Sequence, residues 1–102
     1  MYAYTDIPLG RENAISRAAL ASFWNCDDRT VRDRIARLRS KESPDGTFIV
    51  SHSQGSVKGY YRTDKPDEIR HYINEGRKRI RNTQIPVDNA QKLLKAITEK
   101  SA

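Results

Sequence analysis

The sequence predicts a small α+β domain that is mainly α-helical. Val31, Ile35 and Leu38 recur at i, i+4 and i+7, which is the spacing of one face of a helix. Two short segments rich in β-forming residues, 47–51 and 57–62, flank a glycine-containing loop, as the strands of a β-hairpin do. Helical spacing of apolar residues returns in the last third of the chain, so we expect a helical C-terminal part.

Composition limits both the size of the core and the class of partner. The chain has 102 residues, of which 36% are hydrophobic and 31% are charged, so it forms one small domain or one domain with an extension. Its 19 Lys and Arg residues exceed its 13 Asp and Glu residues, and the resulting charge of +6 favours a polyanionic partner. The single cysteine, Cys26, excludes an intramolecular disulfide and a multi-cysteine zinc site. No apolar run approaches the roughly 20 residues of a membrane span, so we expect a cytoplasmic protein without a membrane partner.

Capping and turn residues predict two short helices before the hairpin. Residues 13–15 are compatible with a very short strand, and Ser16 is a favourable N-cap for the alanine-rich helix 17–23. Asn25 ends that helix, because Asn tolerates the left-handed conformation. Asp27 is placed to cap the next helix, whose positive N-terminal end also favours an acidic residue.

These elements divide the chain into three parts. Residues 1–13 have no clear period and form an N-terminal arm, 14–64 form the core, and 65–102 form C-terminal helices that pack on the core. The Ile85–Pro86 pair interrupts the helical pattern, so two C-terminal helices are expected. The second presents an apolar stripe that packs on the core or forms a homodimer. This stripe consists of Val87, Ala90, Leu94 and Ile97.

Several coupled positions between Leu20 and Arg39 match a known pattern. The pattern has a small residue after leucine, a turn residue four positions on, an apolar and a capping residue, a Thr-Val pair, and later isoleucine and leucine. Its positions are filled by Ala21, Asn25, Cys26, Asp27, Thr30, Val31, Ile35 and Leu38. Together they resemble the helix-turn-helix of winged-helix DNA-binding domains, and the hairpin with Gly55 near its tip resembles the wing. The resemblance implies a winged helix-turn-helix with a two-stranded wing and a C-terminal helical extension.

The wider arrangement, from Gly10 to the tail that begins near Tyr60, resembles small winged-helix proteins carried by bacteriophages and prophages. The chain departs from the family pattern in two places. Asn25 occupies a turn position that is often glycine, and residues 1–13 have little pattern for the helix with which the family usually begins.

The predicted second helix has a polar face opposite its apolar residues. The planar fork of arginine binds guanine O6 and N7 together or bridges phosphate oxygens, and Asp33 is able to accept from a cytosine amine. The resemblance implies that this helix enters the major groove. Its candidate contacts are Asp28, Arg29, Thr30, Arg32, Asp33 and Arg37. The alternative is a solvated helix face that is held together by i, i+4 ion pairs within this set.

Two further groups of polar residues are candidates for DNA contact. The wing candidates, which face phosphates or a minor groove, are His52, Ser53, Gln54, Ser56 and Lys58. The candidate phosphate contacts are Arg17, Arg34, Arg39, Arg70, Arg77, Lys78 and Arg81. The alternatives are an ordinary polar turn for the wing candidates and a solvated helix face for Arg70, Arg77, Lys78 and Arg81. Arg34 and Arg39 lie nearer the core edge of their helix, so we expect them to support the domain or to touch phosphates.

The aromatic residues and the cysteine are expected to be structural. Phe23 and Trp24 end the first helix at positions that usually pack inward, and Cys26 fills an apolar place in the turn. Tyr60 and Tyr61 alternate in direction on a strand, so one of them is expected in the core.

The function expected from these features is sequence-specific binding of double-stranded DNA by a small transcriptional or mobile-element regulator, acting as a homodimer. Two alternatives remain: a protein-interaction module that uses the winged-helix scaffold to bind replication or host machinery, and an RNA-binding winged helix. The two histidines have no spaced metal partners, and no phosphate loop or nucleophile motif appears, so we expect no enzyme, metal, cofactor or small-molecule ligand.

Overall fold

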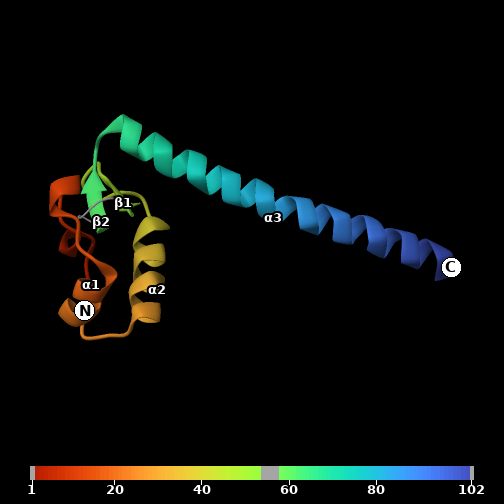
Figure 1. The fold of residues 1–102 in the computed structure, drawn as a ribbon, viewed down its shortest axis with the longest axis horizontal. Helices are drawn as coiled ribbons and strands as arrows, with labels where there is room; N and C mark the ends of the chain where they lie inside the picture. Colours follow the sequence, from red (N-terminus) through yellow and green to blue (C-terminus); the bar gives the residue numbers. More distant parts are fainter. Residues whose placement is uncertain (1, 54–57, 102) are drawn as a thin grey trace. The chain divides into compact units, whose positions relative to one another are not determined.

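The computed structural model describes residues 2–53 and 58–101, and its architecture is α+β and mainly helical (Figure 1). Within these residues it contains three α-helices and a two-stranded antiparallel sheet. Their bounds are α1 Arg17–Phe23, α2 Asp28–Arg39, β1 Phe48–His52, β2 Gly59–Thr63 and α3 Pro66–Ser101. The chain divides into two compact units, Met1–Ile69 and Arg70–Ala102.

The capping and turn residues of the first two helices act as predicted. The Ser16 hydroxyl accepts from the backbone N–H of Ala19 at 3.0 Å, and the Asp27 carboxylate accepts from that of Thr30 at 2.8 Å. Asn25 has a φ of 51°, the left-handed conformation that ends α1. Ser16 and Asp27 therefore set where α1 and α2 begin, and the left-handed backbone of Asn25 turns the chain between them.

The core of the first unit lies between the two short helices and the sheet. Leu20 of α1, Val31 of α2 and Ile49 of β1 are fully buried there. Trp24 is buried as predicted, whereas the prediction that Phe23 packs inward is wrong, because its side chain is 66% exposed. Leu20 and Trp24 are four residues apart and occupy the inward face at the end of α1, so Phe23 falls about 100° away from that face.

Both tyrosines of β2 are buried, on opposite faces of the sheet. Tyr60 joins the core, as expected of one of the pair. Tyr61 pairs across the sheet with Val50, and both are buried outside that core cluster. The Tyr61 hydroxyl donates to Glu68 at 2.7 Å, and burial together with that carboxylate raises the pKa of Tyr61 to about 12.

Ile15 extends the sheet by one residue. Its N–H donates to the Tyr60 carbonyl at 2.9 Å, and the Tyr60 N–H donates back at 2.8 Å. The predicted short strand is thus a single bridge. Gly59 has a φ of 141°, and a Cβ at this position would lie 2.0 Å from the Ile15 carbonyl oxygen, so only glycine fits beside the bridge.

The N-terminal arm contributes to the core. It forms two 3-10 turns, Tyr4–Asp6 and Arg11–Asn13, and Ile7 between them is 0% exposed. Tyr4 is also buried, and its hydroxyl donates to the Thr47 carbonyl at 2.7 Å. The arm therefore fills core space that the sequence pattern did not assign to it.

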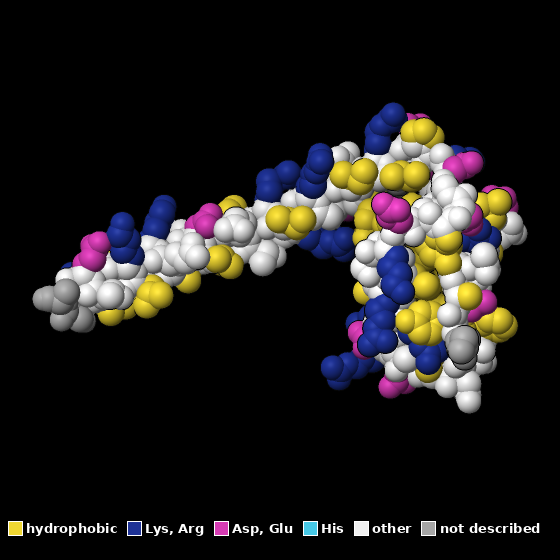
Figure 2. Space-filling model, turned by 180° about the vertical axis from the view of Figure 1, so that it is seen from behind, with side chains coloured by type: hydrophobic (Ala, Val, Ile, Leu, Met, Phe, Trp, Pro, Cys, Tyr) yellow, Lys and Arg dark blue, Asp and Glu magenta, His cyan; other side chains and the backbone are white. Residues whose placement is uncertain are grey.

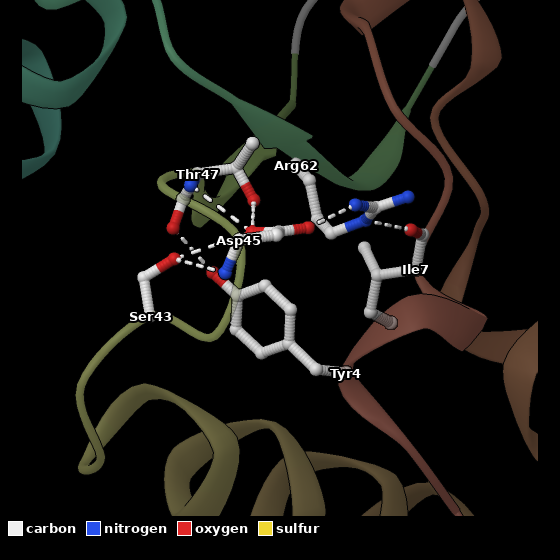
Figure 3. A network of polar contacts seen from close by, with 6 residues as sticks. All are labelled: Tyr4, Ile7, Ser43, Asp45, Thr47 and Arg62. Atoms are coloured by element: carbon white, nitrogen blue, oxygen red, sulfur yellow. Dashed lines mark hydrogen bonds and ion pairs between the residues drawn. The ribbon is translucent and has the colours of Figure 1, made fainter.

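A polar network connects the arm, β2 and the loop before β1 (Figure 3). Arg62 donates from Nε to the Ile7 carbonyl at 2.6 Å, and its Nη1 pairs with the Asp45 carboxylate. Asp45 also accepts from the Thr47 N–H at 3.1 Å and from the Thr47 and Ser43 hydroxyls. The hydrogen bonds from Thr47, followed by that from Arg62, lower the pKa of Asp45 below its ordinary value.

The C-terminal part is one continuous helix, α3, so the prediction of two helices separated at Pro86 is wrong. Pro86 has no N–H for the Asn82 carbonyl, a defect that costs about 3 kcal/mol in a helix interior. The Gln84 side chain donates to the Asp88 carboxylate at 2.7 Å across the proline, which supports the helix on both sides. No helix of the described residues is long and apolar enough to cross a membrane. Packing of residues 65–102 on the core stays a prediction.

Ile7→Ala should lower the free energy of unfolding by about 2–5 kcal/mol, the usual loss for a large aliphatic side chain removed from a core. Leu9→Ala is the matched control, because Leu9 lies in the same arm and is 54% exposed. Chemical denaturation measures both. A loss for Ile7→Ala no larger than that for Leu9→Ala would show that the arm is not part of the core.

Asp45→Asn should lower stability at neutral pH by roughly 1–2 kcal/mol, the loss of hydrogen bonds to a charged group. The pKa of Asp45 is lower in the folded chain than its ordinary 3.8, so its stabilising contribution is complete above pH 3.8 and is lost as the pH falls through the folded value. Urea unfolding of both proteins between pH 7 and pH 3 should show the difference shrinking only below about pH 4. A difference independent of pH would exclude this carboxylate as its source.

Candidate nucleic-acid interface

The rotation of α2 about its own axis is set by its apolar residues. Val31 is 0% and Ile35 is 1% exposed, while Leu38 packs half-buried at the edge of the core. The opposite side of α2 is exposed, as the sequence predicts, and bears Arg29, Arg32, Asp33, Ala36 and Arg37. Figure 2 shows Lys and Arg side chains gathered in a column on the globular part, on the side where α2 lies.

Asp28 connects the two short helices at the start of this face. Its carboxylate accepts from Arg17 Nε of α1 at 2.8 Å and from Arg32 of α2, one turn further along. The hydrogen bond from Arg32, followed by that from Arg17, lowers the pKa of Asp28 below its ordinary value. Solvent screens these half-exposed pairs, so their main effect is on where the two guanidinium groups point.

Arg29 and Arg37 differ from Arg32 in having no ion pair within residues 2–53 and 58–101. The i, i+4 pair of Asp33 with Arg37 is not formed there, although that of Asp28 with Arg32 is. The alternative of a solvated face held by internal ion pairs therefore applies to one end of α2 only. Two exposed guanidinium groups remain available for an external anion.

Arg34 and Arg39 face the domain itself. The guanidinium carbon of Arg34 lies 4.8 Å from the ring centre of Tyr2 and 5.7 Å from that of Trp24, so it stacks on aromatic faces. Arg39 donates from Nε to the Ile49 carbonyl at 2.9 Å. Both side chains are half-buried and support the fold, a role that the sequence predicted as an alternative to phosphate contact.

At the loop end of the hairpin, where β1 stops, His52 contacts a residue that the sequence did not single out. Nη2 of Arg11 lies 3.1 Å from Nδ1 and 2.9 Å from Nε2 of His52. The two residues are 41 positions apart, and no local pattern indicates the contact. Arg11 thus adds a cation beside the wing.

The other sequence candidates lie in three places. Ser53 and Lys58 are exposed at the ends of the hairpin, and Gln54 and Ser56 lie outside the described residues. Exposed positions of α3 in the second unit carry Arg70, Arg77, Lys78 and Arg81. Within the described residues no group of three or more metal-ligating side chains comes together.

No family model matches the chain, and neither the curated proteins nor the solved structures include a significant match to it.

Asp27→Ala should destabilise the protein by about 1 kcal/mol, because it removes the side-chain cap of α2. Asp33→Ala is the matched control: it makes the same change of charge in the middle of the same helix, on the exposed face. We expect it to stay within about 0.5 kcal/mol of the parent in thermal or urea unfolding. Equal effects of the two substitutions would contradict the capping role.

Proposed function

We propose that the chain is a winged-helix protein that binds double-stranded DNA sequence-specifically, as a small transcriptional or mobile-element regulator. The observation that carries the proposal is the exposed face of α2. On this face Arg29 and Arg37 have no ion pair in the described part of the chain, while Val31 and Ile35 hold the opposite side in the core.

The order of elements supports the winged-helix assignment. A short helix, a turn with a left-handed residue and a longer second helix are followed by an antiparallel hairpin. Ile15 adds a third strand position next to β2, immediately before α1. In helix-turn-helix proteins the second helix is the one that enters the major groove. By this assignment α2 is the recognition helix and the hairpin is the wing.

The spacing on α2 suits base recognition. Arg29 and Arg37 are eight residues apart, which is about 12 Å along a helix and close to the width of the major groove. Ala36 between them is small and lets the helix approach the base edges. Arginine binds guanine through two parallel hydrogen bonds, and Asp33 accepts from a cytosine amine. The face therefore combines donors and an acceptor, as a sequence-reading surface requires.

Arg17 and Arg32 are assigned to phosphates. Asp28 holds both guanidinium groups at the N-terminal end of α2, where backbone N–H groups also favour an anion. Such contacts set the position of the protein on the duplex and carry no sequence information. Lys58 and the His52–Arg11 pair are assigned to the wing contact, with Ser53 beside them.

We assign no catalytic activity, metal or cofactor to the protein, since its proposed role needs only this surface. We assign the protein to the cytoplasm, where a DNA-binding regulator meets its DNA. The single Cys26 suits this reducing compartment. RNA binding and a protein-interaction role are the rival outcomes. Of these two, the exposed aromatic ring of Phe23 favours the protein-interaction role, because aromatic side chains are enriched in protein interfaces.

Arg29→Ala and Arg37→Ala should each weaken binding to a duplex selected from a random library by roughly 5- to 150-fold, the effect of losing a base contact worth about 1–3 kcal/mol. The loss should be much smaller on a scrambled duplex, because phosphate contacts are unchanged. Fluorescence anisotropy at fixed salt measures it, and thermal unfolding of each variant checks that the fold is retained.

Lys100→Ala is the control for charge alone, since it removes one positive charge from the last turn of α3. Its affinity should stay within about twofold of the parent, because Lys100 is not among the proposed DNA contacts and salt screens a single exposed charge. Equal losses for Lys100→Ala and Arg29→Ala would contradict base recognition by α2. Tighter binding to an RNA hairpin of the same sequence would favour the RNA alternative, and absence of nucleic-acid binding would favour the protein partner.

A further inference from the structure

The continuity of α3 through Pro86 places most of its large exposed apolar residues, though not Ile85 and Leu93, in a single repeat. One series recurs every seven residues and consists of Ile73, Ile80, Val87 and Leu94. A second series, three positions later each time, consists of Gly76, Thr83, Ala90 and Ile97. The alternating steps of three and four residues persist for more than three heptads, which is the pattern of a coiled coil. These eight residues are called the heptad stripe.

The heptad stripe is apolar surface open to a partner. Ile80 is 67%, Leu94 is 64% and Ile97 is 54% exposed. Figure 2 shows hydrophobic side chains along one edge of the C-terminal half of α3 and Lys and Arg side chains along the other. Most of the stability of a helix in a protein comes from packing of its apolar face, so a stripe of this length indicates an interface.

We infer that the heptad stripe packs against the same stripe of a second copy of the chain, in an antiparallel two-stranded coiled coil. Side-chain size points to this orientation. The first series is large throughout, whereas the second contains Gly76, Thr83 and Ala90. A parallel dimer pairs each position with itself, so the Gly76 layer would be empty, and unfilled core volume is destabilising. An antiparallel dimer pairs one series with the other, so that large residues face small ones.

The register follows from which part of α3 is most exposed. Ile97 is exposed, whereas Ile69 is already half-buried in the first unit, so the register that covers residues 73–97 buries the more exposed surface. Its layers are Ile73 with Ile97, Gly76 with Leu94, Ile80 with Ala90, and Thr83 with Val87, each pair joining one copy to the other. Two of the four layers combine a large with a small side chain, one combines the nearly isosteric Thr83 and Val87, and one combines two isoleucines.

Charge favours the same orientation. Residues 70–81 carry five Lys or Arg and one Glu, a net charge of +4. A parallel dimer places two such segments about 10 Å apart, close to the Debye length at physiological salt. The antiparallel register moves their centres about 28 Å apart along the axis, where salt screens the repulsion. On either side of the heptad stripe, Arg77 faces Gln91 of the second copy and Arg79 faces Leu93 of the second copy. Neither of these two pairs brings like charges together.

The heptad repeat also explains why a proline is tolerated at position 86. It stands beside the heptad stripe and not in it, and the Asn82 carbonyl that it leaves without a helix partner lies on the outer side of the coiled coil. On that side the carbonyl is open to solvent in the dimer. The proline therefore leaves every layer of the interface intact.

The coiled coil itself does not depend on the proposed function. Only its consequence for the spacing of the two DNA-binding units rests on that function. Residue 70 of one copy lies beside residue 100 of the other, so the two attachment points of the proposed DNA-binding units are about 45 Å apart along the axis. A parallel dimer would attach the two units side by side. The antiparallel arrangement suits two separated half-sites or two DNA segments.

The test uses disulfide exchange in the absence of DNA. Chains with Ile80→Cys and chains with Ala90→Cys, both carrying Cys26→Ala, are mixed and equilibrated in a glutathione buffer. The expected main product is the mixed disulfide, separated by mass from the two homodisulfides. A majority of homodisulfides would overturn the antiparallel orientation, and a parent protein that is monomeric by sedimentation equilibrium at tens of micromolar would overturn the dimer.

Ile85→Cys in the same background is the matched control, since Ile85 is an exposed isoleucine of α3 outside the heptad stripe. It should form at least tenfold less disulfide than the mixed pair. Equal disulfide yields would show random collision and would overturn the interface. Because no DNA is present, failure of this test leaves the DNA-binding proposal standing, and failure of DNA binding leaves the coiled coil standing.

Discussion

The arrangement of the first unit depends on the burial of Val31 and Ile35 against Leu20 and Ile49. Full burial of such side chains contributes about 1.5–3 kcal/mol each, which is a large share of the stability of a small domain. A turn of α2 by one residue, about 100°, would bring Arg32 into the core and Val31 out of it. The core therefore determines which arginines of α2 are exposed.

Other contacts make that orientation rigid. The caps at Ser16 and Asp27 fix where the two helices begin, and Arg34 packs on the aromatic rings beneath the turn. On the other side of the unit, the ion pair between Arg62 and Asp45 joins β2 to the loop before β1. The proposed reading surface needs such support, because base contacts tolerate little displacement of the side chains that make them.

Local patterns in the sequence were sufficient for the parts of the fold that depend on neighbours in the chain. The exposed face of α2 follows from the spacing of its apolar residues, and the hairpin follows from two β-rich segments around a loop. Contacts between distant residues were missed, because Tyr4 meets Thr47 and Arg11 meets His52 across more than 40 positions. The sequence pattern predicts a helix end at Pro86, although α3 continues through it.

The most direct measurement of the central claim is an NMR titration of ¹⁵N-labelled protein with the selected duplex. The account predicts that the largest amide shifts lie in residues 28–37, with smaller changes at residues 11, 52, 53 and 58. Side-chain shifts of the Arg29 and Arg37 guanidinium groups should accompany them. Shifts confined to α3, or none at saturating duplex, would contradict the assignment of α2 as the DNA-reading helix.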